Sequence, residues 1–167
     1  MIDISLSDEN RAVLHTVPER WGRMDRLSRA ALLSVGRLLQ QSGLLDENNK
    51  VPVEQPIGLI VGTKKGCLST DIEYSQTLAL GPQLASPALF GYTLPNIPLA
   101  EAAVHYKLTG PVFSLFAEEP LEEAITTARE WLADSPSPCA TIIAGVLDLD
   151  PTAESPVITA EFILCHA

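Results

Sequence analysis

The sequence is short of basic residues, and this shortage argues against two common kinds of partner. Eleven of the 167 residues are Lys or Arg and twenty-one are Asp or Glu, which gives a formal net charge of −10. Nucleic-acid binding depends on clustered basic side chains that contact phosphates, so no nucleic-acid partner is expected. An anionic membrane surface is disfavoured for the same electrostatic reason.

Paired cysteines and long apolar runs are also missing. The three cysteines, Cys67, Cys139 and Cys165, are an odd number at wide spacing without a CxxC motif, so neither a disulfide framework nor a zinc site is indicated. The longest apolar stretches, residues 57–62 and 140–147, are far shorter than the ~20 residues that span a bilayer. The acidic N-terminus lacks the apolar segment of a secretory signal. These absences predict a cytoplasmic protein with no membrane segment, no metal site and no cofactor.

What is present is the composition of an ordinary globular domain. Hydrophobic residues make up 46% of the chain and charged residues 19%, which is unlike a disordered protein. The length suits one domain, since domains usually hold about 100–200 residues. We therefore expect residues 1–167 to form a single domain with a sizeable buried core.

Apolar patterns typical of strands and of helices alternate along the chain. Short apolar runs predict strands over residues 1–6, 56–62, 112–116, 139–147 and 157–165. Helical spacing predicts helices over residues 21–41, 71–80 (with Thr70 as its N-cap), 95–107 and 121–132. The loop between the last two strands is too short for a crossover helix, so these strands should pair antiparallel. The expected fold is α/β, with a mostly parallel sheet, helices on both faces and a C-terminal antiparallel hairpin.

Six short segments stand out in order along the chain. They are R-M-D-R within residues 23–33, V-G-T and Gly66 within 61–66, S-P-A-L-F and T-L-P-N within 86–96, L-T-G-P at 108–111, I-A-G at 143–145 and A-E-F-I-L at 160–164. This series resembles the N-terminal half of β-ketoacyl synthases, the condensing enzymes of the thiolase fold. The resemblance implies a three-layer, thiolase-like half.

The residues that form carbon–carbon bonds in that family are not found where the resemblance places them. In the family, the strand after the Gly-Pro pair leads to a cysteine that becomes acylated, and its position here falls on Glu119. The family's second half carries paired histidines, and this sequence ends at Ala167, where that half would begin. The resemblance therefore implies a chain that does not catalyse condensation on its own.

Glu119 has two interpretations. It can mimic the carboxylate of an acyl or malonyl group. Alternatively, together with Glu118, Glu122 and Glu123, it only places negative charge at the start of a helix whose first residue is Pro120. The helix dipole favours anions there by about 0.3–1 kcal/mol each. The second interpretation is favoured, because a carboxylate is a poor substitute for a thiolate.

Lys64 and Lys65 also have two interpretations. They lie in the turn G-T-K-K-G at residues 62–66, which lacks the spacing of a phosphate-binding P-loop and is most simply a solvated turn. By resemblance, the two lysines can instead contact a phosphopantetheine phosphate or the acidic surface of an acyl carrier protein. They can also lower the pKa of the neighbouring Cys67 thiol, although a structural cysteine is favoured.

The helix predicted over residues 121–132 is amphipathic. Its apolar stripe consists of Leu121, Ala124, Ile125, Ala128 and Leu132. In a complete condensing enzyme the corresponding helix is covered by both halves and is small and apolar nearly all round. The pattern here predicts burial on one side only, as in a protein adapted to a single half.

Three functions remain open. The first is a non-catalytic, ketosynthase-like accessory or scaffold protein in fatty-acid or polyketide biosynthesis that depends on acyl carrier protein. It would form a homodimer, or a heterodimer with a ketosynthase-like subunit, through residues 112–116 with Phe113 and Phe116 as apolar anchors. The second is a half-sized acyltransferase or malonyl-thioester decarboxylase whose site is completed across a dimer. The third is a small-molecule-binding module on a repurposed thiolase-like fold.

Overall fold

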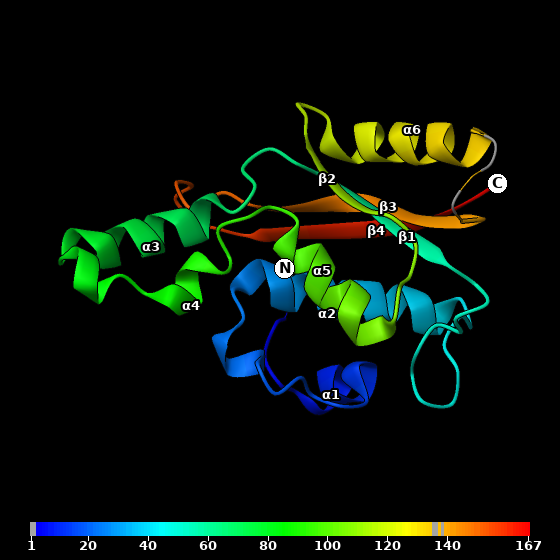
Figure 1. The fold of residues 1–167 in the computed structure, drawn as a ribbon, viewed down its shortest axis with the longest axis horizontal. Helices are drawn as coiled ribbons and strands as arrows, with labels where there is room; N and C mark the ends of the chain where they lie inside the picture. Colours follow the sequence, from blue (N-terminus) through cyan, green and yellow to red (C-terminus); the bar gives the residue numbers. More distant parts are fainter. Residues whose placement is uncertain (1–2, 135–136, 138) are drawn as a thin grey trace.

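A four-stranded sheet forms the centre of the computed structural model, which describes residues 3–134, 137 and 139–167 (Figure 1). The strands are β1 (Ile57–Thr63), β2 (Val112–Phe116), β3 (Thr141–Leu149) and β4 (Ile158–His166), in the spatial order β2-β1-β3-β4. β1 pairs in parallel with both β2 and β3, and β3 pairs antiparallel with β4. The predicted mostly parallel sheet with a C-terminal hairpin is confirmed.

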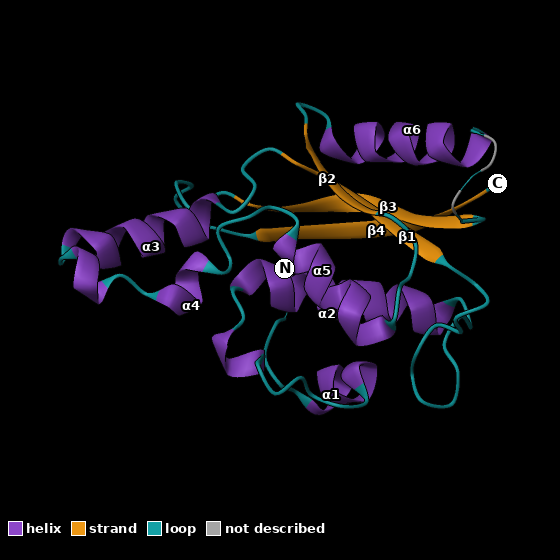
Figure 2. Cartoon of the chain, in the orientation of Figure 1, coloured by secondary structure: helices purple, strands orange, loops and turns teal. Residues whose placement is uncertain are grey.

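Helices cover both faces of this sheet, as predicted (Figure 2). α6 (Pro120–Ala133) packs on one face, while α2 (Arg26–Gln41) and α5 (Ile97–Tyr106) pack on the other. α1 (Asp8–Leu14) packs against α2. The three layers bury all seven residues of β1, which explains why its sequence is continuously apolar rather than alternating.

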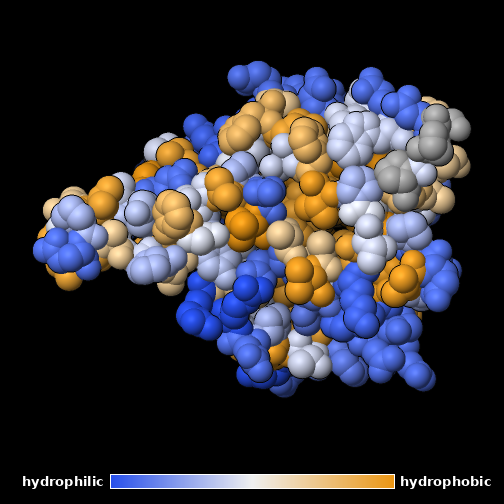
Figure 3. Space-filling model, in the orientation of Figure 1, coloured by the Kyte–Doolittle hydropathy of each residue, from blue (hydrophilic) through white to orange (hydrophobic). Residues whose placement is uncertain are grey.

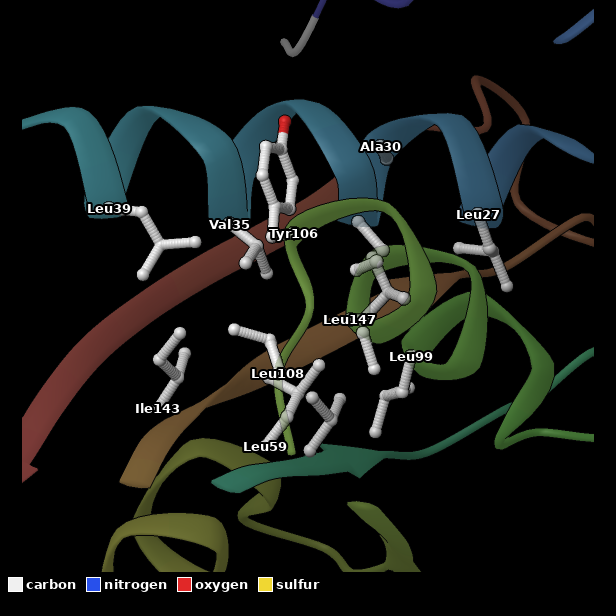
Figure 4. Close-up of a cluster of buried hydrophobic side chains, with 14 of the residues drawn as sticks. Leu27, Ala30, Val35, Leu39, Leu59, Leu99, Tyr106, Leu108, Ile143 and Leu147 are labelled. Atoms are coloured by element: carbon white, nitrogen blue, oxygen red, sulfur yellow. The ribbon is translucent and has the colours of Figure 1, made fainter. Parts of the chain in front are cut away.

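The core between the sheet and α2 is closely packed (Figure 4). Apolar side chains of α2 point toward those of the sheet and α5, and the labelled members of this cluster are Leu27, Ala30, Val35, Leu39, Leu59, Leu99, Tyr106, Leu108, Ile143 and Leu147. A Cβ at Gly36 would lie 2.1 Å from the Tyr106 hydroxyl oxygen, so this glycine makes room for the tyrosine. The buried hydroxyl donates to the Leu32 carbonyl oxygen at 3.0 Å.

A helical projection extends from the body of the molecule. It contains α3 (Leu68–Ala79), a 3-10 helix (Pro82–Leu84) and α4 (Pro87–Phe90). Hydrophobic atoms are visible on its surface in Figure 3. The large apolar side chains that it and the following loop expose are Leu78, Leu80, Leu84, Phe90 and Leu94.

Several predicted elements differ from the structure near the N-terminus. The strand predicted over residues 1–6 is wrong for residues 3–6, and residues 1–2 lie outside the described range. The segment instead packs Ile4 into the core and is held by Asn10, whose side-chain amide donates to the Asp3 and Ser5 carbonyl oxygens. α1 begins before and ends within residues 10–20, a stretch with no clear helical pattern, and its N-cap is Ser7.

Two helix starts also differ from the prediction. A 3-10 helix at Trp21–Arg23 precedes α2, and Asp25 caps α2 by accepting the Ser28 N–H at 2.9 Å. α3 begins three residues earlier than expected, so Thr70 is not its N-cap. The Thr70 hydroxyl donates to the Asp25 carboxylate, which joins the two helix starts.

Across residues 3–134, 137 and 139–167, no helix is both long and apolar enough to cross a membrane.

Candidate functional site

The C-terminal ends of the three parallel strands meet at one edge of the sheet. Thr63 at the end of β1 is paired in register with Phe116 at the end of β2, and the Ala117 N–H donates to the Thr63 carbonyl oxygen at 3.2 Å. Asp148 lies near the end of β3. In open α/β sheets, ligands bind outside the carboxyl ends of the strands. This edge is therefore the candidate functional site.

One carboxylate holds the turn that follows β1. Asp148 accepts the Thr63 hydroxyl at 3.0 Å, the Lys64 N–H at 2.8 Å and the Lys65 N–H at 3.1 Å. The Thr63 hydroxyl oxygen in turn accepts the Gly66 N–H at 2.8 Å. Gly66 has a φ of +57°, which glycine adopts without strain. The turn is thus a concave set of amide groups that binds an anion supplied by the protein itself.

This arrangement leaves the side chains of Lys64 and Lys65, rather than the turn amides, to meet any external anion. The Lys64 side chain is exposed. The Lys65 ammonium lies 3.5 Å from the carboxylate of Asp150, and this ion pair is partly exposed. The sequence analysis did not single out Asp148, although its carboxylate fixes the backbone of both lysines.

The Cys67 thiol is buried and is not prepared for nucleophilic attack. Its sulfur lies 2.7 Å from the Thr93 carbonyl oxygen, to which the thiol donates, and 3.7 Å from the Asp71 carboxylate oxygens. Burial, followed by the Asp71 charge, raises the pKa of the thiol to about 11. The neighbouring lysines do not lower it, so the structural interpretation of Cys67 is favoured. Cys139 and Cys165 are also buried, as predicted.

The start of α6 lies directly against β1. A Cβ at Gly62 would be 1.9 Å from the Pro120 carbonyl oxygen, so only glycine permits this contact. Pro120 lies in the first turn, as predicted, and Glu119 is the N-cap residue. The Glu119 side chain is exposed and makes no capping hydrogen bond, so any favourable effect on the helix comes from its charge alone.

A second polar group, which the sequence analysis did not single out, stabilises the projecting helices. The buried Glu101 carboxylate accepts the Tyr92 hydroxyl at 3.0 Å and the Arg20 guanidinium at 2.9 Å. Burial, followed by the hydrogen bond to Glu101, raises the pKa of Tyr92 to about 12. The network joins α5 to the loop after α4.

Residues 7–118, most of the chain, match the family described as β-ketoacyl synthase, N-terminal domain. The chain belongs to this family. No curated protein matches the sequence. The predicted ketosynthase-like fold is therefore confirmed at the level of the family.

Solved structures of ketosynthases have the same fold. The ishigamide ketosynthase/chain length factor is 19% identical with a TM-score of 0.64, over 83% of this chain and 37% of that chain. The ketosynthase ApeO in complex with its chain length factor ApeC, from Xenorhabdus doucetiae, is 16% identical with a TM-score of 0.63. This match covers 98% of this chain and 74% of that chain. A β-ketoacyl synthase from Burkholderia phymatum is 15% identical with a TM-score of 0.59, over 80% of this chain and 33% of that chain. The present chain thus spans well under two thirds of the first and third.

Two carboxylates and no thiol lie at the junction between β2 and α6 of this ketosynthase-family chain. Between the end of β2 and the start of α6 the sequence reads Ala117-Glu-Glu119, without a thiol. Within the described residues, no group of three or more His, Cys, Asp or Glu side chains is arranged to hold a metal ion. The C-terminal ends of the parallel strands therefore bring together lysines, carboxylates and a protonated thiol.

The two predicted anchor residues lie on the edge strand β2. Phe113 is 42% exposed and packs on the α6 side, where its ring centroid is 5.5 Å from that of Trp131. Phe116 is 64% exposed, and its ring covers Gly66 on the other side of the strand. The edge strand β2, which borders the candidate site, therefore exposes apolar side chains.

α6 is buried on one side only, as its sequence predicted. Ala124, Ala128 and Leu132 are buried against the sheet. The outward face carries the exposed residues Glu122, Glu123, Thr126, Arg129 and Glu130. A second protein layer over this helix would have to remove these charges from water, which is unfavourable unless they are paired.

Proposed function

We propose that this chain is a non-catalytic, ketosynthase-like accessory subunit in biosynthesis dependent on acyl carrier protein. It lacks a nucleophile at the β2–α6 junction, where Glu119 replaces the acylated cysteine of the family. This single replacement carries the proposal, because condensation requires an acyl group to pass from a thioester to a thiolate with release of the carrier thiol, and an exposed carboxylate is a much weaker nucleophile than a thiolate.

A ketosynthase-like chain is the proposed partner. Two of the structures with the same fold are ketosynthase/chain length factor assemblies. The proposed contact is the edge strand β2, where Phe113 and Phe116 place two large apolar rings in solvent. Aromatic side chains of this kind supply much of the binding energy of protein interfaces.

Co-purification with a co-expressed ketosynthase from the same organism tests this interface. Phe113→Glu and Phe116→Glu should each weaken the complex at least tenfold, because a carboxylate cannot be buried unpaired. Val104→Glu is the control: Val104 is 71% exposed and lies on α5 rather than on β2, and its replacement should leave binding unchanged. Absence of any complex, or equal losses in all three variants, would contradict the proposal.

Contact with an acyl carrier protein is a separate part of the proposal. The Lys64 and Lys65 side chains lie at the candidate site with their backbone fixed by Asp148, so they can meet an acidic surface or a phosphate. Reversing both charges, as Lys64→Glu with Lys65→Glu, should abolish carrier-protein binding measured by titration calorimetry at low salt. Binding that persists in this variant would remove the lysines from the proposal.

A further inference from the structure

The outer edge of β4 is long and unprotected. In the part of the chain that the structure describes, β4 pairs with β3 alone, over nine consecutive residue pairs without a bulge. Proteins usually protect such an edge with Pro, Lys, a bulge or a covering segment. The strand sequence I-T-A-E-F-I-L-C-H contains neither Pro nor Lys. A groove of about 500 Å³ runs beside it, lined by residues 158–162 and by α2 residues that include Arg37 and Leu38.

The hydrogen-bond pattern identifies the backbone groups that face outward. The Ala167 N–H donates to the Ala140 carbonyl oxygen at 3.1 Å, and bonded and non-bonded pairs alternate along an antiparallel ladder. Counting back from this pair, every second residue of β4 turns its N–H and C=O away from β3. The outward residues are Ile158, Ala160, Phe162, Leu164 and His166.

We infer that the β4 edge binds a second copy of this chain, β4 to β4 and antiparallel, about a two-fold axis at Phe162. The outward residues are symmetric about Phe162, so every one of them finds a hydrogen-bonding partner in the second strand. In this register Glu161 lies opposite Ile163 of the second copy, and no like charges are directly opposed. A register centred on Glu161 would place two carboxylates opposite one another and would leave His166 without a partner in the second β4.

The expected contact area predicts a reversible dimer. A nine-residue strand is about 30 Å long at ~3.4 Å per residue, and the strand with its bordering helix is about 15 Å deep. Such a strip buries on the order of 900 Å² from both copies, which is near the lower limit for a specific interface. β2 lies at the opposite end of the sheet, so its edge stays open.

Sedimentation velocity over about 1–200 µM protein tests the dimer. The mass should rise from 18.0 kDa to twice that value. Ala160→Pro removes an outward N–H without disturbing the β3 ladder and should keep the protein monomeric, whereas Ala160→Ser retains the N–H and should dimerise normally. A thermal melt checks that both variants fold.

A pair of charge variants tests the register. Ile163, which is 40% exposed, should tolerate both substitutions. Ile163→Glu places a carboxylate opposite Glu161 and should raise the dissociation constant about tenfold, whereas Ile163→Lys should leave it equal or lower. Phe116→Glu, on the β2 edge, should not change self-association, which separates this inference from the proposed ketosynthase partner. A wild-type monomer throughout, a dimer insensitive to Ala160→Pro, or equal effects of the two Ile163 variants would overturn it.

Discussion

The Asp148 side chain organises the candidate site at the scale of single residues. It accepts hydrogen bonds from three residues of the turn after β1 and so ties the end of β3 to the end of β1. Because it satisfies the turn amides, the backbone that carries the two lysines is held in place. The order of the site thus depends on one carboxylate that contacts no partner in our account.

Replacing Asp148 should destabilise the protein. Asp148→Ala leaves the turn donors without an acceptor and should lower the free energy of unfolding by roughly 2–3 kcal/mol, the usual cost of lost hydrogen bonds to a charged group. Urea denaturation measures this change. Asp150→Ala is the control, since that carboxylate is only partly buried and its hydrogen bonds with Thr152 are exposed, so its loss should have a smaller effect. An unchanged unfolding midpoint for Asp148→Ala would refute the role assigned to it.

Cys67 should react slowly with alkylating reagents in the native protein. With a pKa of about 11, only about 0.1% of the thiol is ionised at pH 8, and the thiolate is the reactive form. The rate of labelling by iodoacetamide, followed by peptide mass spectrometry, should therefore rise steeply between pH 8 and 11. Urea-unfolded protein should react much faster at pH 8. Rapid native labelling at pH 7 would instead indicate an activated thiol.

The same shift predicts a loss of stability in alkaline solution. Because the pKa of folded Cys67 lies above its unfolded value, stability is fully present below the unfolded pKa and declines as pH rises toward 11. Denaturation at pH 7 and pH 10 should therefore show a smaller decline for Cys67→Ala than for the wild type. Identical declines would indicate that other groups account for the alkaline loss.

For single residues, the sequence predicted where a side chain lies in the fold more accurately than what that side chain does. The count from the Gly-Pro pair placed Glu119 at the helix start, because strand and helix boundaries there follow directly from apolar runs and Pro120. The role of Asp148 was missed because its contact with Thr63 joins residues 85 positions apart. No local pattern reports such a contact. Only the parallel pairing of β1 with β3 brings the two strand ends together.

Elements with one dominant signal were predicted most accurately. β2 has both predicted ends, and α6 begins and ends within one residue of the prediction. The strand predicted at the N-terminus was wrong because the alternating apolar residues of this segment pack under helices instead of pairing in the sheet. α3 misled because it is mostly exposed and therefore lacks a clear apolar stripe to mark its start.

The contact between β1 and α6 should be intolerant of any added side chain. Gly62→Ala would place a Cβ against the Pro120 carbonyl and should cost about 3 kcal/mol or more of unfolding free energy, since backbone atoms on both sides have to move. Chemical denaturation measures the loss. Gly22→Ala is the matched control, because a Cβ there meets nothing within 4 Å. Equal stability of the two variants would contradict the close packing described for α6.

The whole molecule presents two different edges and one charged helix. The β2 edge is proposed to bind a ketosynthase-like chain and the β4 edge a second copy of this chain. In the expected assembly both edge strands of the sheet are therefore covered. The outward charges of α6 support a protein in which this helix stays at the surface. Sequence periodicity alone predicted this one-sided burial, whereas the two free edges emerged only from the order of strands.

Native mass spectrometry of the chain mixed with a ketosynthase from the same organism and a malonyl- or acyl-thioester tests the central claim most directly. The spectrum reports both the assembly and the covalent acyl load of each chain. We predict a complex in which the acyl group is carried by the ketosynthase and this chain keeps its unmodified mass. An acylated form of this chain, or the absence of any complex, would contradict the account.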